Sequence, residues 1–536
     1  KTTPARMYMD GVDFTPASRN VLFGYQFKSI AATGPIVGPI VAVQWGWLPA
    51  FIWLLLGVLF IGWVHDYSSS VIGVRNEGQT FGALSYRLIS PRARTILLIF
   101  IYFYLLLIMG AFGAIVANAF SNPQVPMGLI VLTLAGVLAG QMIYRWRQDI
   151  ILTTVVTFVI AMLGIWLGTQ AGVANVFAGI NGGPQPLFGA VTQKLFIWTL
   201  VTLAFCYLGA TLPIWRFAQP VNYVSFWVVV AGLLAAVIAI LVWHPDFGDV
   251  PAFTDFSIGL GPLWPILFVT VACGAISGWH GLVSSSGTAR QLEYETDALP
   301  VAGGSMLAEM VLATIALIIA AAGVGTFAQY KTAVAAGGPA VFSAGFGNFV
   351  SHIGIAKEFG VAFGAVFIGI MAMTVMQLVL RFMRVASAEF VGDSLPAMKN
   401  IHVGTIVAVI LSLILIWTGF WQTLWVLFGG ANQLMASLAL LLISTWLIRE
   451  GKSYTWTFYP AIFMYVTTVA ALLWTSFDAF NKVATGIIKP EQVPGSVLAG
   501  LIGLFLVGAA LVLAYDGLTA LNRLRRQVRS EERRVG

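Results

Sequence analysis

The chain has 536 residues, of which 59% are apolar and only 9% are charged. This composition excludes a water-soluble globular protein, because the polar side chains are too few to cover a globule of this size. The net charge of +7 does not indicate binding to nucleic acid, since the basic residues stand singly in short loops and not on one aromatic-rich face. Cys206 and Cys273 are too few for a disulfide framework or a zinc cluster, so we expect no metal site and no cofactor.

Repeated apolar runs predict membrane-spanning helices, because each run can cross about 30 Å of hydrocarbon and none alternates as a barrel strand would. In chain order, the predicted helices lie near residues 22–44, 47–74, 95–119, 127–144, 149–170, 190–213, 221–243, 262–289, 301–328, 359–388, 402–419, 421–447, 456–478 and 495–520. We therefore predict an all-α, polytopic membrane protein with about fourteen transmembrane helices. It is expected to be a single transmembrane domain over residues 1–536, with a core at about 22–447, additional helices at about 456–520 and a basic tail at 521–536. Residues 329–358 and 479–494 are predicted to be connectors that carry Gly or Pro.

The basic residues predict the orientation of these helices in the membrane. If the N-terminus is cytoplasmic, 23 of the 28 Lys and Arg residues fall on the cytoplasmic side, as the positive-inside rule requires. The five exceptions are Lys194, Lys331, Lys357, Lys482 and Lys489. An even number of spans also places the basic tail in the cytoplasm, so we expect both termini there. The first twenty residues lack a charged-then-apolar pattern, and no cleavable signal peptide is expected.

Two of the predicted helices contain interruptions. The first holds Gly34, Pro35, Gly38 and Pro39, which remove backbone donors and tolerate non-helical angles within a span. The eighth holds the stretch Gly274–Gly278, followed by Trp279, His280 and a hydroxyl-rich run. In lipid, such breaks are tolerated only where protein encloses them or where they line an aqueous cavity.

The two interrupted helices are predicted to run in opposite directions through the membrane. Paired breaks of this kind indicate an inverted-repeat transporter with substrate and ion sites near the midplane. The N-termini of the half-helices would attract a carboxylate, and the freed carbonyl groups could hold a cation. The alternative is that Gly and Pro merely kink and pack these helices.

Several long motifs resemble those of the carbon starvation protein A family. The stretch DGVDFTPASRNVLFGYQFKSIAATGPIVGPIVAVQWGWLP, from Asp10 to Pro49, resembles the opening signature of the family. The stretch FVTVACGAISGWHGLVSSSGTARQLEYETDA, from Phe268 to Ala298, is similar to a second signature. LPIW near Pro213 and WVLFGGANQLMASLAL from Trp425 to Leu440 extend the similarity over nearly the whole chain.

The resemblance implies a multi-pass transporter of the bacterial inner membrane that takes up peptides or pyruvate during nutrient limitation. It also implies a core similar to the leucine-transporter fold of the amino acid-polyamine-organocation superfamily. In that fold the two broken helices are five apart in helix number, whereas here they are the first and the eighth and so seven apart, and we therefore expect two inserted helices. Members of the family usually carry more hydrophobic sequence before the first motif, and we therefore expect residues upstream of Lys1.

The candidate site residues are polar or backbone-defining residues within the predicted spans. Those predicted to surround the substrate are Gly34, Gly38, Gly274, Ser277, Gly278, His280, Asn432 and Gln433. Those predicted to couple an ion are Thr374, Gln377 and Asp66. Relatives tend to have Asp at the position of Gln377, so the coupling role could instead fall to Asp66, Glu309 or Glu389.

Each of these polar residues also has a structural alternative. Asp66, beside His65, could form a structural ion pair or snorkel to the interface, and His280 could be a hydrogen-bonded core histidine. Asn432 and Gln433 could hold helices together without a ligand. Arg381 and Arg384 could bind a substrate carboxylate or anchor the chain on the cytoplasmic side, and the acids at 293–297 could form a solvated loop.

The predicted function is secondary active uptake of small carboxylate-bearing nutrients, peptides or pyruvate, during carbon starvation. We expect a symporter that uses a proton rather than sodium, within a lipid bilayer and without a nucleic-acid partner. The alternative is a membrane sensor or channel-like protein without coupled transport. An enzyme is not expected, because five histidines and two cysteines without metal-ligand spacing offer no convergent catalytic group. No nucleotide-binding Gly-rich loop with Lys is present, so direct driving by ATP is not expected either.

Overall fold

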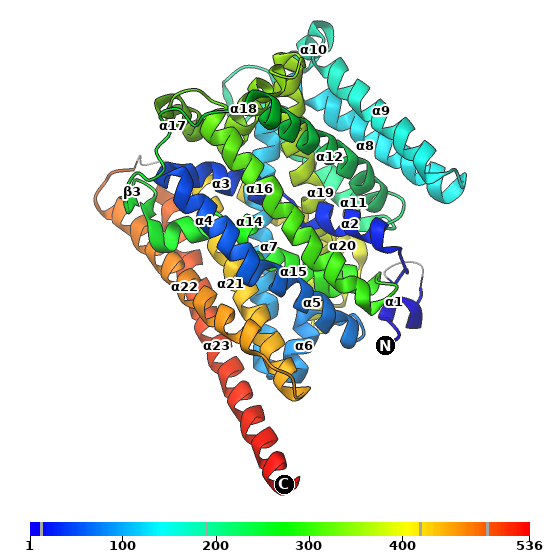
Figure 1. Cartoon of the computed structure of the whole chain (residues 1–536), viewed down its shortest axis with the longest axis vertical. Helices are drawn as coiled ribbons and strands as arrows, with labels where there is room; N and C mark the ends of the chain where they lie inside the picture. The colour runs from blue at the N-terminus through cyan, green and yellow to red at the C-terminus, as the bar shows by residue number, and fades with distance from the viewer. Residues whose placement is uncertain (11–13, 189–190, 418–420, 489–492, 536) are drawn as a thin grey trace.

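The computed structural model describes residues 1–10, 14–188, 191–417, 421–488 and 493–535, which form a helical bundle (Figure 1). Eleven helices in this described part are long and apolar enough to cross a membrane, which confirms an all-α, multi-pass membrane protein. Strands in the described residues are limited to two short antiparallel pairs, β1 (Pro186–Phe188) with β2 (Val191–Thr192) and β3 (Ser257–Ile258) with β4 (Gly261–Pro262).

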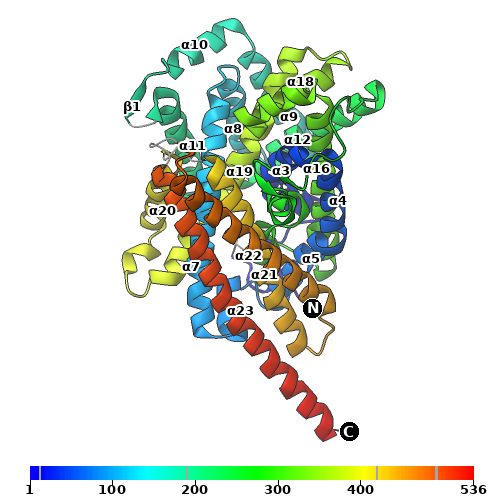
Figure 2. The ribbon, with the colours of Figure 1, turned by 90° about the vertical axis from the view of Figure 1, so that its left-hand side faces the viewer.

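Each of the eleven long helices overlaps a predicted segment, and the last of them continues through most of the stretch predicted as a basic tail. They are α4 to α5 (Trp47–Gly57 and Trp63–Arg75, joined through η2, Val58–Gly62), α7 (Pro91–Phe120), α8 (Pro126–Gly140, continued by η3, Gln141–Arg145), α9 (Ile150–Gly168), α11 (Gln193–Thr211), α12 (Ala218–Trp243), α16 (Gly304–Ala322), α19 (Lys357–Val391), α21 (Trp421–Arg449), α22 (Thr455–Ala484) and α23 (Val493–Val535). In Figure 2, α21, α22 and α23 lie side by side, and α23 extends beyond the bundle to the C-terminus.

Three predicted segments differ from this pattern. The segment predicted at 402–419 is α20 (Ile401–Trp417), and residues 418 and 419 lie outside the described residues. The segments predicted at 22–44 and 262–289 are interrupted. Six continuous spans separate these two interrupted segments, in agreement with the predicted spacing, while the total of fourteen crossings stays a prediction.

The prediction that residues 329–358 form a connector is wrong, because this region contains two helices. These are α17 (Phe327–Ala336) and α18 (Gly338–Ser351). Thr326 and Gln329 form a capping box that starts α17, and Gly337, with a φ of +129°, turns the chain directly into α18. The buried face of α18 packs against α16 and α19 and covers one end of the first interrupted segment. The other short helices are α1 (Pro4–Met7), α6 (Phe81–Leu88), α10 (Ala171–Asn181), η7 (Glu295–Asp297), η8 (Leu299–Gly303) and η9 (Pro396–Lys399).

The first interrupted segment consists of α2 (Arg19–Ile30), α3 (Gly34–Ala42) and η1 (Val43–Trp45). Its break lies at Ala31–Thr33, which corrects the prediction that Gly34 to Pro39 would be non-helical. Pro35 occupies the first turn of α3, where a helix needs no backbone donor, so this proline starts the helix and does not break it. The helix then continues through Pro39.

The second interrupted segment consists of η4 (Leu263–Leu267), α13 (Phe268–Thr270), α14 (Ala272–Ala275), α15 (Gly278–Leu282), η5 (Val283–Gly287) and η6 (Thr288–Arg290). Its backbone is extended at Ile276 and Ser277, within the predicted interruption.

The two interrupted segments run antiparallel to each other, as predicted. Gln26 of α2 contacts Ser284 of η5, whereas α3 packs on α13 and α14. A Cβ atom added to Gly38 would lie 2.6 Å from the backbone oxygen of Thr270, and one on Gly34 would collide with the side chain of Cys273. These two glycines therefore allow a close approach of backbones and are not needed for unusual torsion angles.

We expect Gly38→Ala to lower the stability of the protein by about 1–3 kcal/mol, because the new methyl group meets backbone atoms that cannot rotate away. The measurement is the thermal unfolding midpoint in detergent. The matched control is Gly172→Ala in α10, where no atom lies within 4 Å of the added Cβ. An unchanged midpoint for Gly38→Ala would contradict the close packing of the two segments.

Candidate functional site

The break in the second interrupted segment is held by the side chain of Asn432 on α21. Its Oδ1 accepts hydrogen bonds from Ser277 Oγ at 3.0 Å, from the backbone N–H of Trp279 at 3.2 Å and from Tyr104 Oη at 2.6 Å. Its Nδ2 lies 3.1 Å from Cys273 Sγ, on the other side of the break. Asn432 thus replaces helical hydrogen bonds that the extended backbone has lost, as burial in a membrane requires.

Gln433 performs a similar task one residue later. Its Nε2 donates to the backbone oxygen of Phe268 at 2.8 Å, and Trp53 Nε1 donates to the same oxygen at 3.1 Å. The structure therefore places the amides of both Asn432 and Gln433 on the backbone of the second segment. Both residues are fully buried.

The α2 half of the first segment is joined to the α15–η6 half of the second by side-chain hydrogen bonds. Gln26 Nε2 donates to Ser284 Oγ at 2.8 Å, and Gln26 Oε1 accepts a hydrogen bond from Thr288. Nearer the breaks, Trp279 Nε1 donates to the backbone oxygen of Ser29 at 2.7 Å. These bonds tie the two halves together on one side of the breaks.

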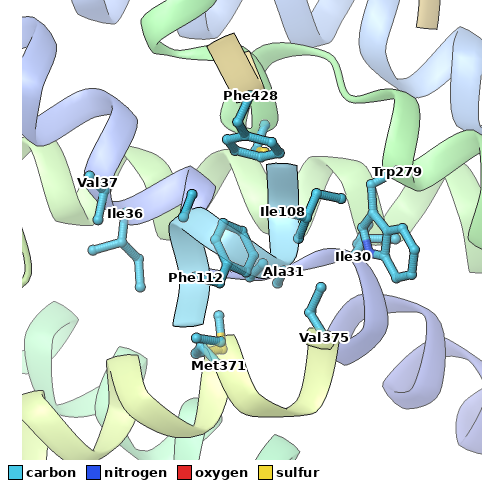
Figure 3. Close-up of a cluster of buried hydrophobic side chains, with 14 of the residues drawn as sticks. Ile30, Ala31, Ile36, Val37, Ile108, Phe112, Trp279, Met371, Val375 and Phe428 are labelled. Atoms are coloured by element: carbon cyan, nitrogen blue, oxygen red, sulfur yellow. The ribbon is translucent and has the colours of Figure 1, made fainter. Parts of the chain in front are cut away.

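Apolar side chains enclose the first break (Figure 3). Ile30 and Ala31 lie beside Ile108 and Phe112 of α7, with Met371, Val375, Trp279 and Phe428 around them. Residues 104, 108 and 112 share one face of α7, so this helix presents Tyr104 to one break and Phe112 to the other. The polar groups at the breaks therefore act in a medium of low dielectric constant.

A chain of buried acids and imidazoles adjoins the second break. His65 Nδ1 lies 2.8 Å from Asp66 Oδ1, and His280 Nδ1 lies 3.0 Å from Asp66 Oδ2. His280 Nε2 is 3.2 Å from Glu309 Oε2 on α16, although neither Glu309 oxygen makes a hydrogen bond in this structure. All four side chains are fully buried. The structure thus joins Asp66 and His280, predicted as separate candidates, through one ion pair.

This arrangement can hold a proton in two places. An ionised Asp66 accepts from Nδ1 of His280, which leaves Nε2 of that ring facing Glu309. A neutral imidazole would pair with a protonated Glu309, and an imidazolium would pair with an ionised Glu309. A proton can therefore move between His280 and Glu309 with little displacement of heavy atoms.

The predicted ion-coupling pair on α19 is divided between two environments. Thr374 Oγ1 accepts a hydrogen bond from the ammonium group of Lys28 at 2.6 Å. Gln377 instead donates to Asn222 Oδ1 at 3.2 Å and packs on Gly209, where an added Cβ would lie 2.3 Å from Gln377 Oε1. Gln377 therefore lies in the contact of α19 with α11 and α12, away from Asp66.

Two adjoining cavities lead from one end of the bundle toward the breaks. The larger, of about 990 Å³, is lined by Thr15, Pro16, Ala17, Ser18, Val21, Gln141, Tyr144, Arg145, Ile214, Trp215, Arg216, Gln219 and Gln291. The smaller, of about 90 Å³, shares three of these residues and reaches Tyr25, Ser286 and Leu378. The ring of Phe382 lines it and packs edge-on against Trp279 at 5.4 Å. These two rings lie between the cavities and the breaks.

The remaining charged candidates either cap a helix or form ion pairs. Arg381 donates to the backbone oxygens of Gly209 at 3.2 Å and of Leu212 at 2.7 Å, and so caps the end of α11. Glu293, predicted to lie in a solvated loop, pairs with Arg6 at 2.7 Å, and Glu295 pairs with Arg75. Within the described residues, no group of three or more His, Cys, Asp or Glu side chains is arranged to hold a metal ion.

Several residues of the site were absent from the predicted set. They are Lys28, Gln26, Tyr104 and His65, with Glu309 named only as an alternative. Lys28 and Glu309 carried a usable signal, because each is the sole charged residue in the interior of its apolar run. Gln26 and Tyr104 gave none, since their roles depend on partners that are far away in sequence.

The comparisons with known proteins agree on one family. The family model described as "Carbon starvation protein CstA" matches residues 1–330 and 322–471. The "Peptide transporter CstA" of Campylobacter jejuni is 28% identical over 91% of this chain and 77% of the relative, and that of Bacillus subtilis is 27% identical over 96% and 90%. The "Pyruvate/proton symporter BtsT" of Escherichia coli is 28% identical over 88% of this chain and 76% of the relative.

We expect Asn432→Leu to lower the free energy of unfolding by about 1–3 kcal/mol, because the buried hydroxyl of Tyr104 and the N–H of Trp279 would lose their acceptor. Thermal unfolding in detergent measures the loss. Asn481→Leu, at an exposed position of α22, is the control and should leave the midpoint unchanged. Equal midpoints for the two variants would rule out a bracing role for Asn432.

Proposed function

The chain belongs to the carbon starvation protein CstA family, and on this basis we propose that it is a proton-coupled secondary transporter that takes up a small carboxylate-bearing nutrient. The names of the relatives, peptide transporter and pyruvate/proton symporter, support a peptide or pyruvate as substrate and a proton as coupling ion. We place it in the bacterial inner membrane, where it takes up its substrate during carbon starvation, and assign it transport rather than catalysis.

The observation that carries this proposal is the buried chain of Asp66, His280 and Glu309 next to the second break. Ionisable groups within a membrane are costly, and a chain of them in a transporter marks a proton path. His280 belongs to α15, which begins directly after the break, whereas Asp66 and Glu309 belong to continuous helices. A movement at the break would therefore change the distance from His280 to both acids and would couple protonation to conformation.

The cavities support a pathway from the cytoplasm. Arg145 and Arg216 line the larger cavity, and both lie in the basic loops that the positive-inside rule assigns to the cytoplasm. We propose that this conformation is accessible from the inside, with both termini cytoplasmic. The transport core is assigned to about residues 22–447, with the helices from 456 to 520 and the tail at 521–536 as additions to it.

The test is uptake of labelled pyruvate and of labelled dialanine by the purified chain in liposomes. An inward gradient of about one pH unit supplies roughly 1.4 kcal/mol per proton, enough for about tenfold accumulation by a one-proton symporter. We expect such accumulation of one substrate under the proton gradient and none under a sodium gradient alone. Accumulation that required sodium, or no uptake of either substrate by folded protein, would refute the proposal.

We expect Glu309→Gln to abolish this accumulation while exchange of labelled for unlabelled substrate continues. The amide keeps the shape of the side chain but cannot take the proton from His280. The accumulation ratio should fall from about ten to about one. Glu358→Gln, at an exposed position near the start of α19, is the matched control and should accumulate substrate normally. Full proton-driven accumulation by Glu309→Gln would show that this carboxyl group is not part of the coupling path.

A further inference from the structure

Lys28 places a fully buried amino group next to the first break. Its ammonium group makes one hydrogen bond, to Thr374 Oγ1 at 2.6 Å, and that hydroxyl group also donates to the backbone oxygen of Ile370. No ion pair joins Lys28 to a carboxylate in the described part of the chain. An ammonium group has three N–H donors, so a neutral hydroxyl satisfies it only in part.

In the described residues, the elements that pack on α2 supply no acid to pair with this group. They include α12, α16, α19, η5 and η8, and also α15 and η6, which bond to α2 through Trp279 and Thr288. Glu309, the acid of α16, faces His280, and the acids of α19, Glu358 and Glu389, lie near the two ends of that helix. Burying an unpaired charge costs several kcal/mol, which the fold would avoid with an apolar residue at this position.

The break beside Lys28 has further polar atoms without partners. Ser29 Oγ and Thr33 Oγ1 are buried and make no hydrogen bond. Buried apolar side chains gather around Ala31, as Figure 3 shows. A ligand that carries a negative charge and hydrogen-bond acceptors would satisfy both hydroxyl groups and the remaining donors of Lys28.

The cavity that leads to the breaks ends one helical turn from Lys28. Tyr25 of α2 and Leu378 of α19 line it, and they precede Lys28 by three residues and follow Thr374 by four. Residues at these spacings lie on the same helix face. A small molecule in the cavity therefore approaches the ammonium group along the contact between α2 and α19.

We infer that Lys28 is the group that binds the carboxylate of the transported substrate, and that the substrates are small molecules with a free carboxylate. The inference rests on the proposed transport function and adds the residue that selects the substrate class. Lys28 supplies a charge-assisted hydrogen bond, Thr374 orients the ammonium group, and the apolar side chains around Ala31 exclude water. The neutral amide of the same substrate would leave the buried charge unpaired and would be rejected.

The test compares binding of acids and their amides to the full chain in detergent. The probes are pyruvate and dialanine, with pyruvamide and dialanine amide as their neutral counterparts, and binding is measured by the ligand-induced shift of the unfolding midpoint. We expect at least one of the acids to stabilise the wild-type chain and neither amide to do so. Lys28→Met should weaken binding of that acid at least about tenfold. Lys331→Met, which removes an exposed lysine of α17, should bind it normally.

The stability of the unliganded variant separates a binding role from a structural one. If Lys28 serves the ligand, Lys28→Met without ligand should unfold at the same temperature as the wild-type chain or higher, since an uncompensated charge has been removed. Lys28→Gln provides a second neutral variant. Failure of both variants to fold would show that the structure itself requires the ammonium group and would overturn the inference.

The remaining outcomes distinguish this inference from the proposed function. Equal binding of an acid by Lys28→Met and wild type, or equal stabilisation by acid and amide, would overturn the role of Lys28 while leaving proton-coupled transport intact. Normal binding together with absent proton-driven accumulation by the wild-type chain would overturn the coupling and leave the carboxylate site. If neither acid stabilises the wild-type chain, both the role of Lys28 and the proposed transport of these substrates would be overturned.

Discussion

The close antiparallel contact of the two interrupted segments is the constraint on which the other features of the core depend. Each break exposes backbone groups that lipid cannot satisfy, so the breaks must be enclosed by protein. Gly34 and Gly38 let α3 approach α13 and α14 closely, and Asn432 accepts hydrogen bonds from the hydroxyl of Ser277 and from the backbone N–H of Trp279 at the second break. The continuous helices α7, α19 and α21 then surround this contact with apolar side chains.

This contact brings two sets of buried ionisable groups, which are far apart in sequence, near each other in the fold. The acid and imidazole groups adjoin the second segment, and the lone ammonium group of Lys28 belongs to the first. One hydrogen bond, from Trp279 to the backbone of Ser29, joins the two segments between them. Its donor precedes His280 by one residue and its acceptor follows Lys28 by one. The proposed proton site and the proposed carboxylate site are thus linked by a single hydrogen bond between residues next to them.

The sequence predicted the spans and the antiparallel breaks well, because long apolar runs and Gly or Pro clusters are local signals. The position of the first break was wrong, since Pro35 fits the first turn of a helix as well as it fits an interruption. The helices α17 and α18 were missed because a short amphipathic pair looks like a connector. Asp66, His280 and Glu309 could each be identified in the sequence as an ionisable residue in an apolar run. Their contact with one another depends on the tertiary structure and could not be predicted. Lys28 was overlooked among apolar neighbours, and Gln377 proved to face Asn222.

The bond between Trp279 and Ser29 has a thermodynamic consequence for the proposed cycle. If occupancy near Lys28 alters the free energy of adding a proton near His280, then protonation must alter substrate affinity by the same factor. The effect of the substrate on proton binding and the effect of the proton on substrate binding are therefore equal in size. The magnitude of the slope of the logarithm of substrate affinity against pH would therefore equal the number of protons taken up when substrate binds. This number can be measured by binding alone, without a transport assay.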